Sequence, residues 1–196
     1  MSEGRIAAAL LAAGESRRLG QPKQLIQLAG ESLLRRSARL ALEAGCSPVF
    51  VVLGFAAERM WPELEGLAVQ VLTNPEWAEG MASSLRCGVE AAKVAGGEGV
   101  LLLVCDQPRL SVGHLRMLLD RHHQPGSLLT ASRYGDRVGV PAVFSAELFP
   151  ELLDIKGDRG ARQVIERHRD AVQIVDCPDG TLDVDSPEQR RCITGE

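Results

Sequence analysis

Residues 6–23 read IAAALLAAGESRRLGQPK, an apolar run followed at once by a loop with two glycines and three basic residues. The run at residues 6–13 contains no polar residue, which is typical of a strand buried on both faces of a sheet. Similar runs predict further strands at residues 48–53, 68–72, 99–105, 128–131, 141–145 and 172–177. Stretches with apolar residues at helical spacing separate many of these runs. The alternation predicts an α/β fold with a mostly parallel, doubly wound sheet flanked by helices.

The spacing of apolar residues also locates the helices. It predicts helices around residues 33–42, 85–92 and 115–119, and a later helix at residues 158–168. Ser111 precedes the third of these and is expected to be its N-cap, and Ser186, followed by a proline, is expected to begin a last helix. The segment from about residue 130 to residue 168 interrupts the simple alternation, so we expect it to hold a second substrate.

The length and composition are those of one globular domain. The chain has 196 residues, of which 45% are hydrophobic, enough to build one full core over residues 1–196. A net charge of −4 argues against a nucleic-acid partner bound through a broad basic face. No apolar run is long enough to cross a bilayer, and the five cysteines lack the spacing of a zinc site. We therefore expect a cytoplasmic protein with no nucleic-acid or membrane partner.

The loop after the first strand has the properties of a phosphate-binding loop. Gly14 and Gly20 let the backbone turn tightly and come close to a ligand, and the amides of such a loop can point at anionic oxygens. Arg17, Arg18 and Lys23 add positive charge to the same loop. The loop matches neither the Walker pattern nor the dinucleotide GxGxxG pattern. A plain strand-to-helix loop with exposed basic residues is the alternative, but the position after the first strand favours phosphate binding.

A second motif places a carboxylate at the end of a buried strand. The run at residues 99–105 ends before Asp106, and Pro108 prevents its continuation. A carboxylate facing a phosphate loop would repel a nucleotide unless a cation lay between them, so Asp106 is predicted to hold Mg²⁺ rather than to be a solvated loop residue. Asp183 and Asp185 lie on one side of an extended segment, and either is a candidate second ligand. Asp185 could instead favour the positive end of the helix that follows.

Residues 74–85 read NPEWAEGMASSL and join a short strand to a helix. Two interpretations of this segment stay open. Ser83 or Ser84 caps the helix through its hydroxyl group, or the hydroxyl and amide groups at the helix start contact a nucleobase.

Together these motifs resemble the molybdenum cofactor cytidylyltransferases, a family related to the molybdenum cofactor guanylyltransferases. LAAGESRRLGQPK at residues 11–23 is similar to the general nucleotidyltransferase pattern LAAGxSxRxGxxK. The more specific matches are the 74–85 segment, CDQP at 105–108, GVPAVF at 139–144, GDRGAR at 157–162 and DVDSPE at 183–188. The resemblance implies a Rossmann-like nucleotidyltransferase fold. Its nucleotide-binding part would span about residues 1–110 and its acceptor part about residues 111–196.

The resemblance also implies roles for individual residues. The nucleotide would be bound by Leu11, Ala12, Ala13, Gly14, Ser16, Arg18, Lys23, Ser83, Ser84 and Asp106. Lys23, Arg18 and Asp106 would be catalytic, while Asp106 and Asp185 would hold Mg²⁺, with Mn²⁺ as the alternative. The acceptor would be bound by Arg133, Gly139, Pro141, Gly157, Asp158 and Arg159.

The implied reaction transfers CMP from CTP to the terminal phosphate of molybdopterin and releases pyrophosphate. No general base is needed, because a phosphate monoester with a second pKa of about 6 is largely ionised at neutral pH. CTP is expected over GTP because residues 12–14 read AAG where the guanylyl branch has a second glycine, and the extra methyl group crowds a purine. The alternatives are a GTP-using transferase that acts on molybdopterin or a sugar phosphate, and a non-catalytic carrier of the molybdenum cofactor. The recipient of the product would be an apo molybdenum hydroxylase.

Overall fold

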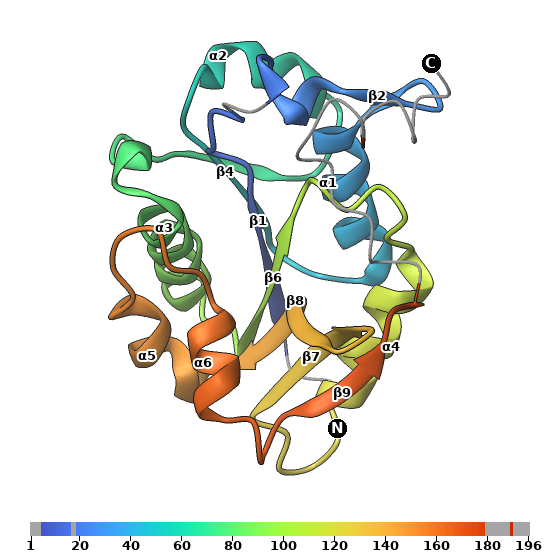
Figure 1. The fold of residues 1–196 in the computed structure, drawn as a ribbon, viewed down its shortest axis with the longest axis vertical. Helices are drawn as coiled ribbons and strands as arrows, with labels where there is room; N and C mark the ends of the chain where they lie inside the picture. Colours follow the sequence, from blue (N-terminus) through green and yellow to red (C-terminus); the bar gives the residue numbers. More distant parts are fainter. Residues whose placement is uncertain (1–4, 17–18, 179–188, 190–196) are drawn as a thin grey trace.

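The computed structural model describes residues 5–16, 19–178 and 189, and its centre is a seven-stranded sheet (Figure 1). The strand order is β5-β4-β1-β6-β8-β7-β9. The strands are β1 (Ile6–Leu11), β4 (Val49–Leu53), β5 (Gln70–Thr73), β6 (Gly99–Val104), β7 (Leu129–Tyr134), β8 (Arg137–Ser145) and β9 (Gln173–Asp176). A separate two-stranded ribbon pairs β2 (Gln27–Leu28) with β3 (Glu31–Ser32).

The sheet is parallel except at β8. The pairs β1–β4, β1–β6, β4–β5 and β7–β9 are parallel, whereas β8 runs antiparallel to both β6 and β7. Only Gly135 and Asp136 lie between β7 and β8, and so short a connection allows only an antiparallel pair. The expected mostly parallel α/β sheet is confirmed, with this hairpin as the departure from simple alternation.

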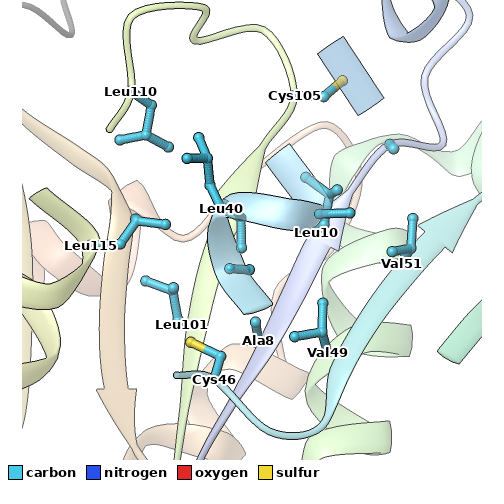
Figure 2. Packing of buried hydrophobic residues seen from close by; sticks show 14 of the residues in the cluster. Ala8, Leu10, Leu40, Cys46, Val49, Val51, Leu101, Cys105, Leu110 and Leu115 are labelled. Carbon is cyan, nitrogen blue, oxygen red and sulfur yellow. The ribbon is translucent and has the colours of Figure 1, made fainter. Parts of the chain in front are cut away.

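Helices cover both faces of the sheet and create two separate apolar clusters. They are α1 (Leu33–Ala44), α2 (Ala57–Met60), α3 (Met81–Val94), α4 (Val112–His122), α5 (Phe149–Leu153) and α6 (Arg162–Arg167). Side chains of α1, α2 and α4 pack on one face, and those of α3, α5 and α6 pack on the other. Strand β1 contributes to both clusters because its side chains alternate, with Ala8 and Leu10 on one face and Ala7 and Ala9 on the other. Figure 2 shows Leu40, Leu110 and Leu115 over the first of these faces.

The helix boundaries confirm part of the sequence analysis. Ser111 is the N-cap of α4, and its hydroxyl oxygen accepts a hydrogen bond from the amide of His114 at 3.2 Å. Helix α6 is shorter than the predicted helix at 158–168, because residues before Arg162 form a turn. The helix expected from Ser186 lies outside the described residues.

Other sequence expectations concern the membrane and the thiols. No helix in the described ranges combines the length and apolar character needed to span a bilayer. Of the described cysteines, Cys46 is buried and Cys87 is half-buried, and both are free thiols.

Burial of His122 at the end of α4 makes stability depend on pH. Burial, with a smaller contribution from the charge of His123, lowers the pKa of His122 to about 4. Between pH 6.5 and pH 4 the unfolded chain therefore binds a proton that the folded chain does not, so stability is full above this window and falls as the pH falls through it. We expect the free energy of unfolding to drop by about 2 kcal/mol between pH 7 and pH 5 through this group.

Urea denaturation at both pH values, on the wild type and on His122→Gln, measures this contribution. Glutamine keeps a polar group near Ser127 and Thr130, which lie 3.4 Å from the imidazole Nδ1 atom, but it does not titrate. The variant should lose less stability between pH 7 and pH 5 than the wild type. Equal losses in the two proteins would contradict the assignment.

Candidate active site

The site lies where two neighbouring parallel strands end. Leu11 of β1 is in register with Val104 of β6, so the loops that follow these strands leave the same edge of the sheet side by side. The carboxyl edge of an open α/β sheet is where ligands bind. The sequence-predicted phosphate loop and Asp106 are brought together at this edge.

An internal scaffold shapes the first loop. The buried Gln24 side chain donates from Nε2 to the carbonyl oxygens of Ala12 and Gly14, each at 2.8 Å. Ser16 accepts a hydrogen bond from the Lys23 amide at its Oγ atom, at 3.1 Å, and has a φ of 58°. These contacts close the loop on itself and hold the Lys23 end of the loop beside its start. Sequence reasoning missed Gln24. The only signal for it in the sequence is its position directly after the basic end of the loop.

Lys23 and Asp106 meet across the site. The Lys23 Nζ atom lies 2.5 Å from Asp106 Oδ2, and the two side chains are only 20% and 14% exposed. The other carboxylate oxygen, Asp106 Oδ1, is buried, and no donor in the described part of the chain reaches it. An unpaired buried carboxylate oxygen is costly unless a cation or donor completes it. Asp106 therefore fits a divalent cation, for which carboxylate oxygen is a preferred ligand.

The remaining predicted partners at this point cannot be placed. Arg18 and Asp185 lie outside the described residues. Within the described ranges no group of three or more His, Cys, Asp or Glu side chains forms a metal site. Mg²⁺ is commonly held by one or two carboxylates together with substrate phosphates, so the single described carboxylate is compatible with such a site.

Two cavities adjoin at Asp106. The first, which we call the loop cavity, has a volume of about 460 Å³ and is bordered by the phosphate loop and the 77–81 turn. Of the predicted nucleotide-binding residues, those lining it are Leu11, Ala13, Gly14, Ser16, Lys23, Ser84 and Asp106. The second, the hairpin cavity, has a volume of about 540 Å³ and is bordered by the β7–β8 hairpin. The residues that line both cavities are Leu11, Met81, Val104 and Asp106.

Acidic side chains dominate the described wall of the loop cavity. Glu15, Glu79, Asp106 and Asp158 face the cavity together with Lys23. A polyphosphate would be repelled by this wall unless positive charge were added. These acidic side chains therefore favour a ligand that binds together with a divalent cation.

Ser83 and Ser84 hold the 74–80 turn in place. The buried Asn74 amide nitrogen donates to both hydroxyl oxygens, at 2.8 and 3.0 Å. The Ser83 hydroxyl lies 2.9 Å from the carbonyl oxygen of Glu76 and 3.0 Å from that of Gly80. The expectation that a serine caps α3 is wrong, because the N-cap is Gly80 and both serines lie within the first turn. Ser84 lines the loop cavity. The role of Asn74 was not predicted from the sequence.

The predicted acceptor residues are distributed unevenly. Gly139 lines the hairpin cavity, whereas Asp158 lines the loop cavity. Arg133 forms an exposed ion pair with Asp176, at 2.6 and 3.0 Å, and is not among the residues that line either cavity.

The other three predicted acceptor residues also lie off the cavity walls. The Pro141 carbonyl oxygen accepts a hydrogen bond from the buried Ser132 hydroxyl at 2.6 Å, so this residue belongs to the packing of the hairpin. Neither Gly157 nor Arg159 is among the lining residues of either cavity.

Other residues of the hairpin cavity carry its polar chemistry. The Gln107 amide nitrogen donates to the Tyr134 hydroxyl at 3.2 Å and to the Val140 carbonyl at 3.0 Å. The Gln107 carbonyl oxygen is buried and has no partner in the described ranges. Arg137 and Arg162 add positive charge to the same wall, and Asp136 adds negative charge. Gln107 lies in the CDQP motif, and the hairpin brings Tyr134 to it. The sequence does not predict this contact, because the polar residues of the hairpin do not follow the apolar pattern of the strands.

Comparison with known proteins identifies the same type of domain. The family model described as "MobA-like NTP transferase domain" matches residues 8–172. Nicotine blue oxidoreductase from Paenarthrobacter nicotinovorans is 35% identical over 191 residues, covering 92% of each chain. Purine catabolism protein PucB from Bacillus subtilis is 34% identical, covering 91% of each. A probable molybdenum cofactor guanylyltransferase from Opitutus terrae is 32% identical over 105 residues, covering 54% of this chain and 50% of the relative.

Solved structures extend the similarity to the whole fold. Rv0371c from Mycobacterium tuberculosis, crystallised as a complex with manganese, superposes with a TM-score of 0.77 and 29% identity. The match covers 98% of this chain and 99% of that one. A nucleotidyl transferase from Methanothermobacter thermautotrophicus has a TM-score of 0.82 at 25% identity, with 97% of each chain covered.

Gly80 provides a test of how closely the site is packed. Its φ is +125°, and a Cβ atom there would lie 2.7 Å from the carbonyl oxygen of Gly157. Gly80→Ala should therefore lower the free energy of unfolding by about 2 kcal/mol or more. Gly14→Ala, on the opposite wall, meets nothing within 4 Å and should stay within about 0.5 kcal/mol of the wild type. Chemical denaturation of both variants measures the difference, and equal stabilities would contradict the packing.

Proposed function

Because the chain belongs to the MobA-like NTP transferase domain family, we propose that it transfers CMP from CTP to the terminal phosphate of molybdopterin and releases pyrophosphate. One observation carries the proposal: two cavities meet at Asp106, which pairs with Lys23 and keeps a second carboxylate oxygen unsatisfied. A nucleotide in the loop cavity and an acceptor in the hairpin cavity would have their phosphates at this junction. Transfer between two substrates requires such a meeting point.

The bond changes need no acid or base from the protein. An oxygen of the acceptor phosphate attacks the α-phosphorus of CTP, a new P–O bond forms, and the bond between the α-phosphorus and the bridging oxygen breaks. Pyrophosphate leaves with the electron pair of that bond. Because the acceptor phosphate is largely ionised at neutral pH, no proton has to be removed first. This agrees with the junction, where Asp106 is paired with Lys23 and the other residues that line both cavities are apolar.

The residues of the phosphate loop would position and neutralise the triphosphate. The amides of Ala13 and Gly14 follow β1, and Lys23 supplies charge next to the point where the pyrophosphate forms. The Ala12 amide already donates to the Val52 carbonyl oxygen at 2.9 Å, so the proposed role of Ala12 is to shape the loop. Arg18 is proposed for the same role. Asp106, with Asp185 as its proposed partner, would hold Mg²⁺ or Mn²⁺. When bound, the cation would offset the negative charge of the phosphates against these carboxylates.

The preference for CTP is proposed from Ala13. Both Ala12 and Ala13 are buried, but only Ala13 is among the residues that line the loop cavity. A methyl group there leaves less room for a purine than glycine would. Ala13→Gly should raise the ratio of kcat/KM for GTP to that for CTP by on the order of tenfold. Pyrophosphate release with each nucleotide measures the ratio, and an unchanged ratio would remove Ala13 from the choice of base.

The acceptor is proposed to occupy the hairpin cavity, with Gly139 in its wall and Gln107 and Arg137 as its polar contacts. Asp158 lines the loop cavity, and this position favours contact with the nucleotide. The other predicted acceptor residues are proposed to act on the acceptor indirectly, through the residues that line the cavity; they are Arg133, Pro141, Gly157 and Arg159. The product would pass to an apo molybdenum hydroxylase in the cytoplasm. The alternatives are GTP as donor, a sugar phosphate as acceptor, and a carrier role without catalysis.

The decisive experiment removes the charge of Asp106 without changing its shape. Asp106→Asn should lower the rate of metal-dependent pyrophosphate release from CTP and molybdopterin at least about 100-fold, while the melting temperature changes little. Asp120→Asn, on the exposed side of α4, is the control and should retain full activity. If Asp106→Asn unfolds the protein instead, the carboxylate is structural.

A substrate panel separates the alternatives. Wild-type protein is assayed with CTP or GTP against molybdopterin or a sugar phosphate, and the product is identified by its mass. Because a relative is named an oxidoreductase, NADPH oxidation with a dye acceptor is a further arm. Dye reduction without pyrophosphate release would overturn the proposal.

A further inference from the structure

An ion pair and its hydrogen bonds join the turn that borders the loop cavity to the segment that leads into the wall of the hairpin cavity. The Glu79 carboxylate accepts two hydrogen bonds from the Arg86 guanidinium, at 3.0 and 2.6 Å, and one from the Gly157 amide at 3.2 Å. Arg86 also donates to the carbonyl oxygen of Ile155 at 2.8 Å. We call these four residues the latch. They connect the turn before α3 and the start of α3 to a segment about 70 residues further along the chain.

The backbones are also in close contact around the latch. The Ala82 amide donates to the Gly157 carbonyl at 3.1 Å. A Cβ atom on Gly80 would lie 2.9 Å from the Asp158 Cα atom, and one on Gly160 would lie 2.9 Å from the Met81 sulfur. Figure 1 shows the segment that leads into α6 lying beside α3. Any movement of one segment must therefore move the other.

One residue of the latch, Glu79, lines the loop cavity, and the segment bonded to it continues into the wall of the hairpin cavity. Glu79 and Asp158 line the loop cavity, whereas Gly160 and Arg162 line the hairpin cavity. Arg86 is not among the lining residues of either cavity. A ligand that fixes the 77–81 turn would therefore also fix the segment that precedes the hairpin-cavity wall.

We propose that Arg86 is a positioning residue that couples nucleotide binding in the loop cavity to the placement of the acceptor-side wall. The inference rests on the proposed function. An ion pair whose side chains are 25% and 35% exposed contributes little to stability by itself, but a two-point guanidinium–carboxylate contact with backbone partners fixes the orientation of both groups. Hydrogen bonds from Arg86, and then from the Gly157 amide, lower the pKa of Glu79, so its carboxylate stays charged around neutral pH.

Kinetics of Arg86→Lys and Arg86→Gln test this role. Lysine keeps the charge but cannot contact Glu79 at two points and Ile155 at the same time. We expect kcat/KM for molybdopterin to fall by roughly 10- to 100-fold in Arg86→Gln and by less in Arg86→Lys, while the dissociation constant for CTP with Mg²⁺ changes less than about threefold. Arg39→Gln, which removes another two-point contact, between Arg39 and Glu31 of a distant surface, is the matched control and should leave both constants unchanged.

Hydrogen exchange supplies a readout that does not depend on catalysis. CTP with Mg²⁺ should slow amide exchange across residues 155–162 in the wild type and in Arg39→Gln, and this slowing should be lost in Arg86→Gln although CTP still binds. Wild-type turnover with unchanged constants and unchanged protection in Arg86→Gln overturns the latch alone. A wild type that neither binds CTP nor releases pyrophosphate overturns the proposed function, and the latch with it.

Discussion

The parallel pairing of β1 with β6 is the constraint on which the site depends. Their register sets the end of β1 beside the end of β6. With the loop contacts of Gln24 and Ser16, this pairing brings Lys23 within 2.5 Å of Asp106 although the two are 83 residues apart. Both strands are buried on both faces, so the pairing is stabilised by the two apolar clusters rather than by any contact at the site. The packing of the core can therefore offset the cost of leaving Asp106 Oδ1, at the edge of the sheet, without a partner among the described residues.

The sequence was most informative where one physical requirement dominates. Strands such as β1 and β6 must be continuously apolar because helices cover both faces, and their positions follow from that. The same reasoning places the 12–16 loop and Asp106 at one edge, since parallel strands share their carboxyl edge. The strands predicted at residues 128–131 and 141–145 are shorter than β7 and β8. The reason is that the polar ends of the hairpin, including Tyr134 and Arg137, line a cavity instead of the core.

The residues that sequence reasoning missed hold loops in place through buried hydrogen bonds. Gln24 shapes the phosphate loop by donating to two carbonyl oxygens, and Asn74 binds two hydroxyl groups that looked like a helix cap or a base contact. A polar side chain that satisfies buried main-chain groups has no spacing rule, because its partners are decided by tertiary packing. Its function becomes visible only when the loops are seen together.

Tertiary packing also brings together motifs that lie far apart in the sequence. Two such motifs are the segments at residues 74–85 and 157–162. Gly80 and Gly160 allow the two segments to approach more closely than a side chain at either position would permit. The first segment borders the loop cavity, and the second begins the wall of the hairpin cavity. Close backbone contact between them makes one structural unit from the walls of two sites. In the proposed reaction between two polyanions, a shared wall would bring their phosphates together without requiring them to attract each other.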